Sequence, residues 1–188
     1  MTPLPREFGA KLGAWDPVNG WSPIHWSDTY AAESISGVSR LLVAPRQPLS
    51  FVVDALALYG NSFKLVYLLV TPPDGYEFAR YELDALSLEE VSSVLQEFGG
   101  FLGGDARHHI WIHALDGGGT LIWDEHDWVY LYGHLASATD LLQSKGFQEG
   151  KPEIPFPHLH NEDPDQTSEM ERLLKALPWV KTPVSNPQ

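Results

Sequence analysis

The chain has 188 residues, of which 43% are hydrophobic, so it is long enough for one well-buried core and is not a disordered chain. Its 12 Lys and Arg against 25 Asp and Glu give a net charge of −13, which argues against direct binding to nucleic acids or anionic membranes. The absence of cysteine excludes disulfides, thiolate metal sites and cysteine nucleophiles, and it favours a cytoplasmic location. No segment has the apolar core of a signal peptide or the roughly 18 apolar residues of a membrane helix, so we expect a soluble protein.

Residues 1–36 contain many turn formers and no clear periodicity, so we expect an irregular N-terminal segment. Within it, Trp15, Trp21 and Trp26 are spaced among proline and glycine residues. Such rings can form a stacking platform for sugars. More often they pack over a core as a lid, because each indole buries a large area.

The next part of the chain alternates between helix and strand patterns. A helix is expected over residues 48–59, where Pro48 suits the first turn and apolar residues recur at helical spacing. A second helix should begin at the capping box Ser87-Leu88-Glu89-Glu90 and end at the glycine-rich stretch 99–104. Strands are expected over residues 37–44, 63–71 and 76–83.

Residues 108–132 have the pattern of an antiparallel three-strand meander, because two turn signals divide a stretch rich in Ile, Trp, Val and Tyr. Two-residue loops at Gly117-Gly118 and Glu125-His126 would place Trp111 opposite Asp124. Both faces of these strands are largely apolar, which favours a sheet covered on both sides. A shift by one residue would exchange the faces without making either one polar, so the turns must set the register.

The C-terminal third adds two helices to this sheet. The expected segments are a helix over 135–146, a proline-rich extended connector over 151–163, an amphipathic helix over 164–177 and a frayed tail over 182–188. The whole chain, residues 1–188, is therefore predicted to be a single α+β domain. Its mostly antiparallel sheet should have about five to six strands covered by about four helices.

The corner formed by the second turn of the meander is the best candidate site. Asp124 and Asp127 flank the turn, His126 lies at its tip, and the predicted pairing brings His109 beside it. Two carboxylates and two imidazoles can bind a divalent cation, or they can act as a general base oriented by an acid. The structural alternative is that the aspartates only bond backbone amides of the turn.

A second candidate is the pair His158 and His160, because alternate side chains of an extended segment point the same way and such pairs can bind zinc. The residues that follow do not supply further ligands at the offsets of known histidine-rich hydrolase motifs. Motifs for serine nucleophiles and for phosphate cradles are also missing from the sequence. The sequence therefore indicates no cofactor, with a divalent metal ion as the one that remains open.

Three functions are compatible with these observations. The one the sequence favours is a non-enzymatic acidic protein, of the bacterial immunity or inhibitor type, that docks on a basic protein partner. The expected docking residues are acids on exposed faces: Glu89, Glu90, Glu97, Glu162, Asp163 and Asp165. The second function is a small metal-dependent hydrolase that uses the corner at the turn, joined by His158 and His160. The third is a carbohydrate-binding protein that uses the N-terminal tryptophans.

Overall fold

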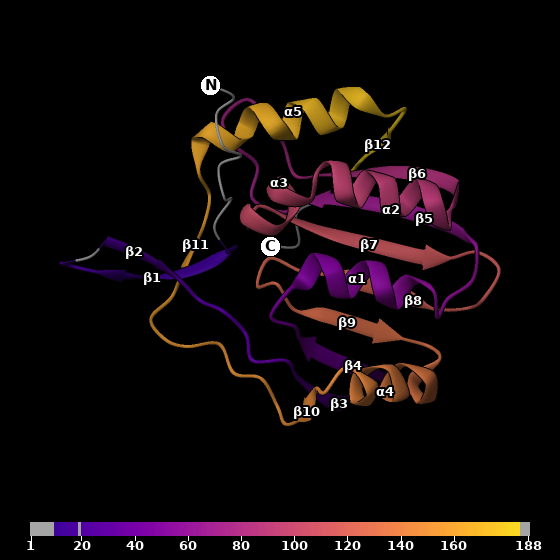
Figure 1. The fold of residues 1–188 in the computed structure, drawn as a ribbon. Coiled ribbons are helices and arrows are strands. Elements are labelled where there is room, and N and C mark those ends of the chain that lie inside the picture. The colour runs from indigo at the N-terminus through magenta and orange to yellow at the C-terminus, as the bar shows by residue number, and fades with distance from the viewer. Residues whose placement is uncertain (1–9, 19, 185–188) are drawn as a thin grey trace, which may run out of the picture.

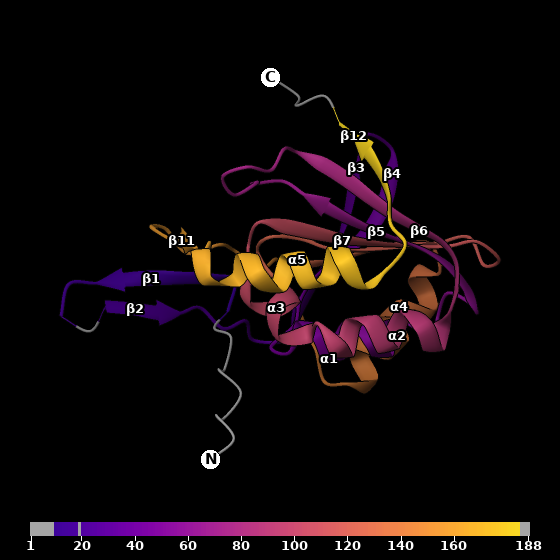
Figure 2. The same cartoon turned by 90° about the horizontal axis from the view of Figure 1, so that it is seen from above.

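A computed structural model describes residues 10–18 and 20–184, and its main feature is a nine-stranded sheet with helices packed on one face (Figures 1 and 2). The strand order is β10-β3-β4-β9-β8-β7-β5-β6-β12. Neighbouring strands are antiparallel except for β10 and β3. In this order the strands are Gln148–Glu149, Thr29–Ile35, Val38–Ala44, Val129–Tyr132, Thr120–Trp123, His108–Ala114, Ser62–Leu69, Ala79–Ser87 and Val180–Pro183.

A second, smaller sheet extends away from the larger one, on the side where the turn between β8 and β9 lies (Figures 1 and 2). It is antiparallel, with the order β11-β1-β2. Its strands are Leu159–His160, Leu12–Asp16 and Gly20–Pro23. The short central contact between β1 and β11 joins the N-terminal hairpin to the proline-rich connector.

The helices give the larger sheet one buried face. Four of them, α1 to α4, lie in front of the sheet in Figure 1, and α5 lies along the margin formed by β6 and β12. Their bounds are Pro48–Leu56, Leu88–Glu97, Gly99–Gly104, Leu135–Ser144 and Thr167–Ala176, with a 3-10 turn η1 at Pro164–Gln166. None of the helices among the described residues is long and apolar enough to cross a bilayer.

The structure confirms the α+β class and the mostly antiparallel sheet, but the sheet is larger than expected. The N-terminal segment is not irregular throughout, because residues within 1–36 form β1, β2 and β3; residues 1–9 and 19 lie outside the described part. The glycine-rich stretch 99–104 forms the short helix α3 instead of only ending α2. Part of the expected tail is also ordered, since Val180–Pro183 pairs with β6; residues 185–188 lie outside the described part.

The predicted meander is present as β7, β8 and β9, but both turns are longer than two residues. Trp111 lies opposite Ile122 instead of Asp124, a shift of two residues that leaves the faces unchanged. In the second turn, Trp123 lies opposite Val129, a shift of one residue that exchanges the faces of β9. As a result, Val129 joins the buried side of the sheet. The expected cover on both sides is only partial: the helices pack on one face, whereas on the other Trp111 and Ile122 are half-buried and Val66 beside Trp111 is buried.

Candidate metal centre

Asp124 organises the turn between β8 and β9. Its buried carboxylate accepts hydrogen bonds from the backbone N–H of His126 at 2.8 Å and of Trp128 at 2.9 Å. The second carboxylate oxygen accepts from the hydroxyl of Tyr130 at 3.1 Å and lies 3.4 Å from Nδ1 of His126. Asp124 therefore fixes the turn and one nitrogen of the histidine ring at its tip, which leaves Nε2 of His126 available for a ligand.

Asp127 closes the same turn in a left-handed conformation, with φ of 61°. Its side chain is buried and accepts hydrogen bonds from Nε1 of Trp123 at 2.9 Å and from the backbone N–H of Lys11 at 3.3 Å. The buried Nζ of Lys11 donates in turn to the backbone carbonyl of Asp124 at 2.8 Å. These contacts join the N-terminal hairpin to the turn and give Asp127 a structural role.

The proline-rich connector returns to the same corner through β11. His160 lies opposite Leu12 of β1, and the backbone N–H of Asn161 donates to the carbonyl of Lys11 at 2.7 Å. The side-chain amide of Asn161 donates to the carbonyl of Gly104 at 2.7 Å. The strand that carries His160 is therefore fixed both to the hairpin and to the end of α3.

Three imidazoles from these segments converge. The ring centroids of His126 and His160 are 5.1 Å apart. The ring centroid of His158 lies 6.0 Å from that of His126 and 5.6 Å from that of His160. One ligand nitrogen of each ring lies within 4.8 Å of the other two. Nε2 of His160 is shielded from solvent and has no hydrogen-bond partner. The Nδ1 of His158 lies 3.0 Å from the carbonyl of Pro155, so donation there leaves its Nε2 free.

This donor set fits a divalent transition-metal ion. Neutral imidazoles are preferred ligands of Zn²⁺ and related ions, and three of them leave a position open for water or substrate. In metal sites a ligand histidine often directs its second nitrogen to a carboxylate or a carbonyl. Asp124 and the carbonyl of Pro155 have this relation to His126 and His158.

The carboxylate of Glu125 lies beside the three imidazoles. Glu125 is half-buried, with one oxygen in contact with Nε2 of His109 and the other 3.5 Å from Nδ1 of His126. His109 lies on β7, opposite Leu68, and does not belong to the group of three imidazoles. The arrangement holds a proton acceptor next to the proposed ligands.

Burial and neighbouring charges shift the pKa values of four residues at the site. Burial disfavours the ionised form of Asp124, but the hydrogen bond and charge of His126 and the backbone donors outweigh it and lower its pKa. Burial likewise opposes protonation of His126, but Asp124 outweighs it and raises the pKa of that ring. Burial and the neighbouring His126 lower the pKa of His160, which keeps it ready to bind a metal ion. Burial raises the pKa of Asp127 to about 6, against the attraction of Lys11.

The structure thus joins the two sequence candidates, since His158 and His160 lie beside the turn that carries His126. It places Asp124 and Asp127 beneath the turn as hydrogen-bond acceptors. Glu125 and Lys11 were not among the predicted site residues. Glu125 could have been suspected from its place between Asp124 and His126, whereas no signal in the sequence ties Lys11 to a turn more than a hundred residues away.

Several of the acids predicted to dock on a partner are engaged within the chain. Glu90 completes the capping box of α2 with Ser87, and Glu97 forms an ion pair of 2.9 Å with Arg172. Asp163 accepts a hydrogen bond from the backbone N–H of Asp165 at 2.9 Å. Glu89 and Glu162 are exposed.

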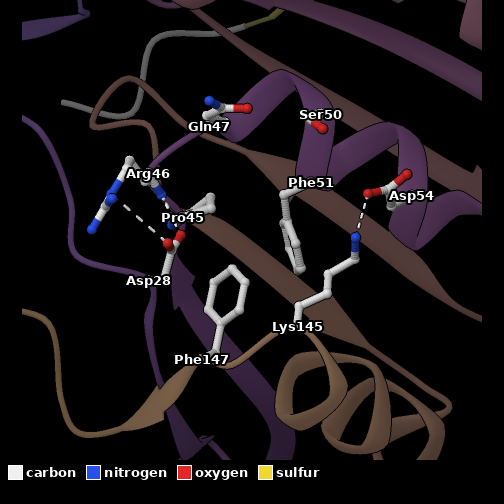
Figure 3. Close-up of a pocket in the computed structure, with 9 residues that line it drawn as sticks. All are labelled: Asp28, Pro45, Arg46, Gln47, Ser50, Phe51, Asp54, Lys145 and Phe147. Atoms are coloured by element: carbon white, nitrogen blue, oxygen red, sulfur yellow. Dashed lines mark hydrogen bonds and ion pairs between the residues drawn. The ribbon is translucent and has the colours of Figure 1, made fainter.

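Hollows also lie elsewhere on the described surface. One of about 300 Å³ opens between the beginning of α1 and the end of α4, over a floor of two phenylalanine rings (Figure 3). Its cations already have acidic partners, because Nζ of Lys145 lies 2.6 Å from Asp54 and Arg46 lies beside Asp28. A smaller hollow of about 190 Å³ reaches Asp127. The histidine cluster is the stronger candidate site because its donors converge.

Comparison with known proteins finds no matching family model, no matching characterised protein and no matching solved structure.

Proposed function

We propose that the protein is a metal-dependent hydrolase whose divalent ion is held by His126, His158 and His160. The observation that supports this proposal is the convergence of three imidazoles from two distant segments, one of them with an unpartnered nitrogen shielded from solvent. A divalent ion in such a site supplies a Lewis acid and lowers the pKa of water. Glu125 lies where it can accept the proton released when water attacks a substrate, and His109 holds its carboxylate.

The direct test is metal binding followed by a search for turnover. Protein purified without chelators should bind about one equivalent of Zn²⁺ in a calorimetric titration, and Co²⁺ should give visible absorption of a four-coordinate site. His126→Ala and His160→Ala should each lose this binding. The exposed His25 provides the matched control, so His25→Ala should keep it.

Turnover separates the metal centre from the hydrolase. Hydrolysis of a carboxylic ester, a phosphate ester or a peptide that requires both the metal and Glu125 would support the proposal. Tight metal binding without turnover of any of these substrates would contradict the hydrolase. Failure to bind any of Zn²⁺, Co²⁺ or Mn²⁺ would contradict both.

A different observation favours a second function: the basic side chains are paired with acidic side chains of the same chain. Nearly all described lysine and arginine side chains form ion pairs with acids of the same chain. The excess acids then set the outer field, which would attract a basic partner protein of the kind that an immunity or inhibitor protein neutralises. Binding to purified basic proteins should weaken strongly with added salt and with Glu89→Gln plus Glu162→Gln. Binding that is insensitive to salt would contradict this function.

A further inference from the structure

The small sheet carries two tryptophans on one face. Directly opposed residues of antiparallel strands place their side chains on the same side. Trp15 lies opposite Trp21, and Gly13 lies opposite both Pro23 and Leu159. These five residues therefore share one face of the sheet, which we name the tryptophan platform.

The platform is directed away from the histidine cluster. His160 lies opposite Leu12, one position from Gly13, and therefore on the other face of the sheet. The hairpin that carries the platform extends beyond the larger sheet and its helices (Figures 1 and 2). A ligand of the platform would therefore lie on the opposite face of the small sheet from the proposed metal centre.

The two indoles differ in exposure. Trp15 is 66% exposed, although tryptophan normally buries most of its large surface. Trp21 lies against the backbone at Gly13, where an added Cβ would overlap the Cζ2 and Cε2 atoms of its ring. The third tryptophan behaves differently, because Trp26 packs 5.7 Å from the ring of Trp128 and donates to the carbonyl of His126 at 2.9 Å.

We propose that the tryptophan platform binds a short neutral carbohydrate. The C–H groups on one side of a pyranose ring pack against the electron-rich face of an indole. The outer strand β2 has no neighbour on its other side within the described sheet, so its outward peptide groups can bond sugar hydroxyls. The net charge of −13 disfavours anionic glycans.

A protein partner or a second copy of the chain fits the platform less well. Stable protein interfaces bury about 1,200–2,000 Å² in total, with some 20 residues or more on each side. The platform offers five residues, one of them a glycine. A surface formed by five residues suits one or two sugar rings.

The test is a titration of the intact protein with neutral cello-, xylo-, malto- and chito-oligosaccharides, followed by tryptophan fluorescence and calorimetry. At least one series should give saturable binding. Trp15→Ala should weaken it by about tenfold or more, the effect that loss of an aromatic ring has on a stacked nucleic-acid base.

The controls keep the outcome specific. Trp179→Phe, with a half-buried ring on another part of the chain, should bind as the parent does, and so should His126→Ala, which removes a proposed metal ligand. Circular dichroism of Trp15→Ala checks that the variant folds. No saturable response in any series, or unchanged affinity of Trp15→Ala, would overturn the proposal. A dimer that dissociates on Trp15→Ala would overturn it in favour of a second copy.

Discussion

Asp124 is the residue on which the proposed metal centre depends, although it is not one of the proposed ligands. Its carboxylate already accepts two backbone N–H groups of the turn and the hydroxyl of Tyr130. The remaining interaction faces Nδ1 of His126 and sets the orientation of that ring. Asp124 therefore couples the shape of the turn to the position of one ligand.

Asp124→Asn should weaken Zn²⁺ binding by about ten- to a hundredfold, the usual effect of losing an outer-shell partner of a ligand histidine. The amide keeps the size of the side chain but loses the negative charge that faces His126. Calorimetric titration measures the change. Asp116→Asn is the matched control, since Asp116 is also a turn aspartate that accepts a backbone N–H, that of Asn61 at 3.1 Å. Equal affinities for the two variants would show that Asp124 has no part in metal binding.

His108 makes the fold sensitive to acid. The ring is buried between Tyr67 and Phe101, at centroid distances of 5.0 and 5.1 Å. Burial and the charge of Lys11 hold the pKa of His108 well below the usual range, so the folded protein keeps the ring neutral. Below about pH 6.5 the unfolded chain binds a proton that the folded protein does not. The stability from this group is therefore present above that pH and is lost as the pH falls.

His108→Phe should flatten the fall of the free energy of unfolding between about pH 6.5 and pH 5, by up to about 1.4 kcal/mol per pH unit. Urea unfolding at a series of pH values measures the slope. His25→Phe, at an exposed position, should leave the slope unchanged. A slope that is the same in His108→Phe and the parent would contradict the buried neutral state.

At the scale of elements, α2 shows how a local signal fixes a helix end. Ser87 accepts the backbone N–H of Glu90 at 3.2 Å, and the Glu90 carboxylate accepts the backbone N–H of Ser87 at 2.8 Å. The buried face of the helix, Val91 and Leu95, then packs on the sheet. The cap and the apolar stripe together place α2 over β5 and β6.

Ser87→Ala should lower the free energy of unfolding by about 1 kcal/mol, because it removes both hydrogen bonds of the serine hydroxyl at the helix start. Chemical denaturation gives the difference. Ser93→Ala, at an exposed position within the same helix, should change stability by less than about 0.5 kcal/mol. A loss of similar size in both variants would argue against a capping effect.

The sequence predicted those elements whose signals are local. The capping box of α2, the proline at the start of α1 and the turn formers of the meander all lie within a few residues of what they determine. The register of β9 was wrong by one residue because Asp127 adopts a left-handed conformation and lengthens the turn. Asp and Asn tolerate that conformation, but the sequence alone does not say which turn residue adopts it.

The parts that could not be predicted depend on distant contacts. β1 and β11 are short, and they pair with each other across most of the chain; Lys11, just before β1, also bonds the distant turn at Asp124. The sequence therefore showed His126 and the pair His158 and His160 as separate candidates. Only the fold of the connector brings them to one place.

At the scale of the whole molecule, the proposed metal centre would connect parts that share few regular contacts. His126 lies in the turn between β8 and β9 of the large sheet, whereas His158 and His160 belong to the connector that leads from β10 into β11. The described connector is attached at its ends by backbone hydrogen bonds, from Gly150 to the carbonyl of Tyr30 at 2.8 Å and from Asn161 to Lys11 at 2.7 Å. Between these points a metal ion would link the connector to the turn that carries His126.

Metal binding should therefore protect the connector from proteolysis. Glu153 is exposed in the middle of it, so a protease that cleaves after glutamate should cut there through local opening of the chain. An ion that binds only the closed form reduces that opening by the factor 1 + [L]/Kd, about a hundredfold at free metal of 100 Kd. Mass spectrometry of the fragments over time gives the rate of cleavage after Glu153. His158→Ala should be cut at the same rate with and without Zn²⁺, whereas His25→Ala should be protected like the parent. Equal protection of His158→Ala would mean that the ion acts on the protease or binds elsewhere. The prediction that the ion links the connector to the turn that carries His126 would then be wrong.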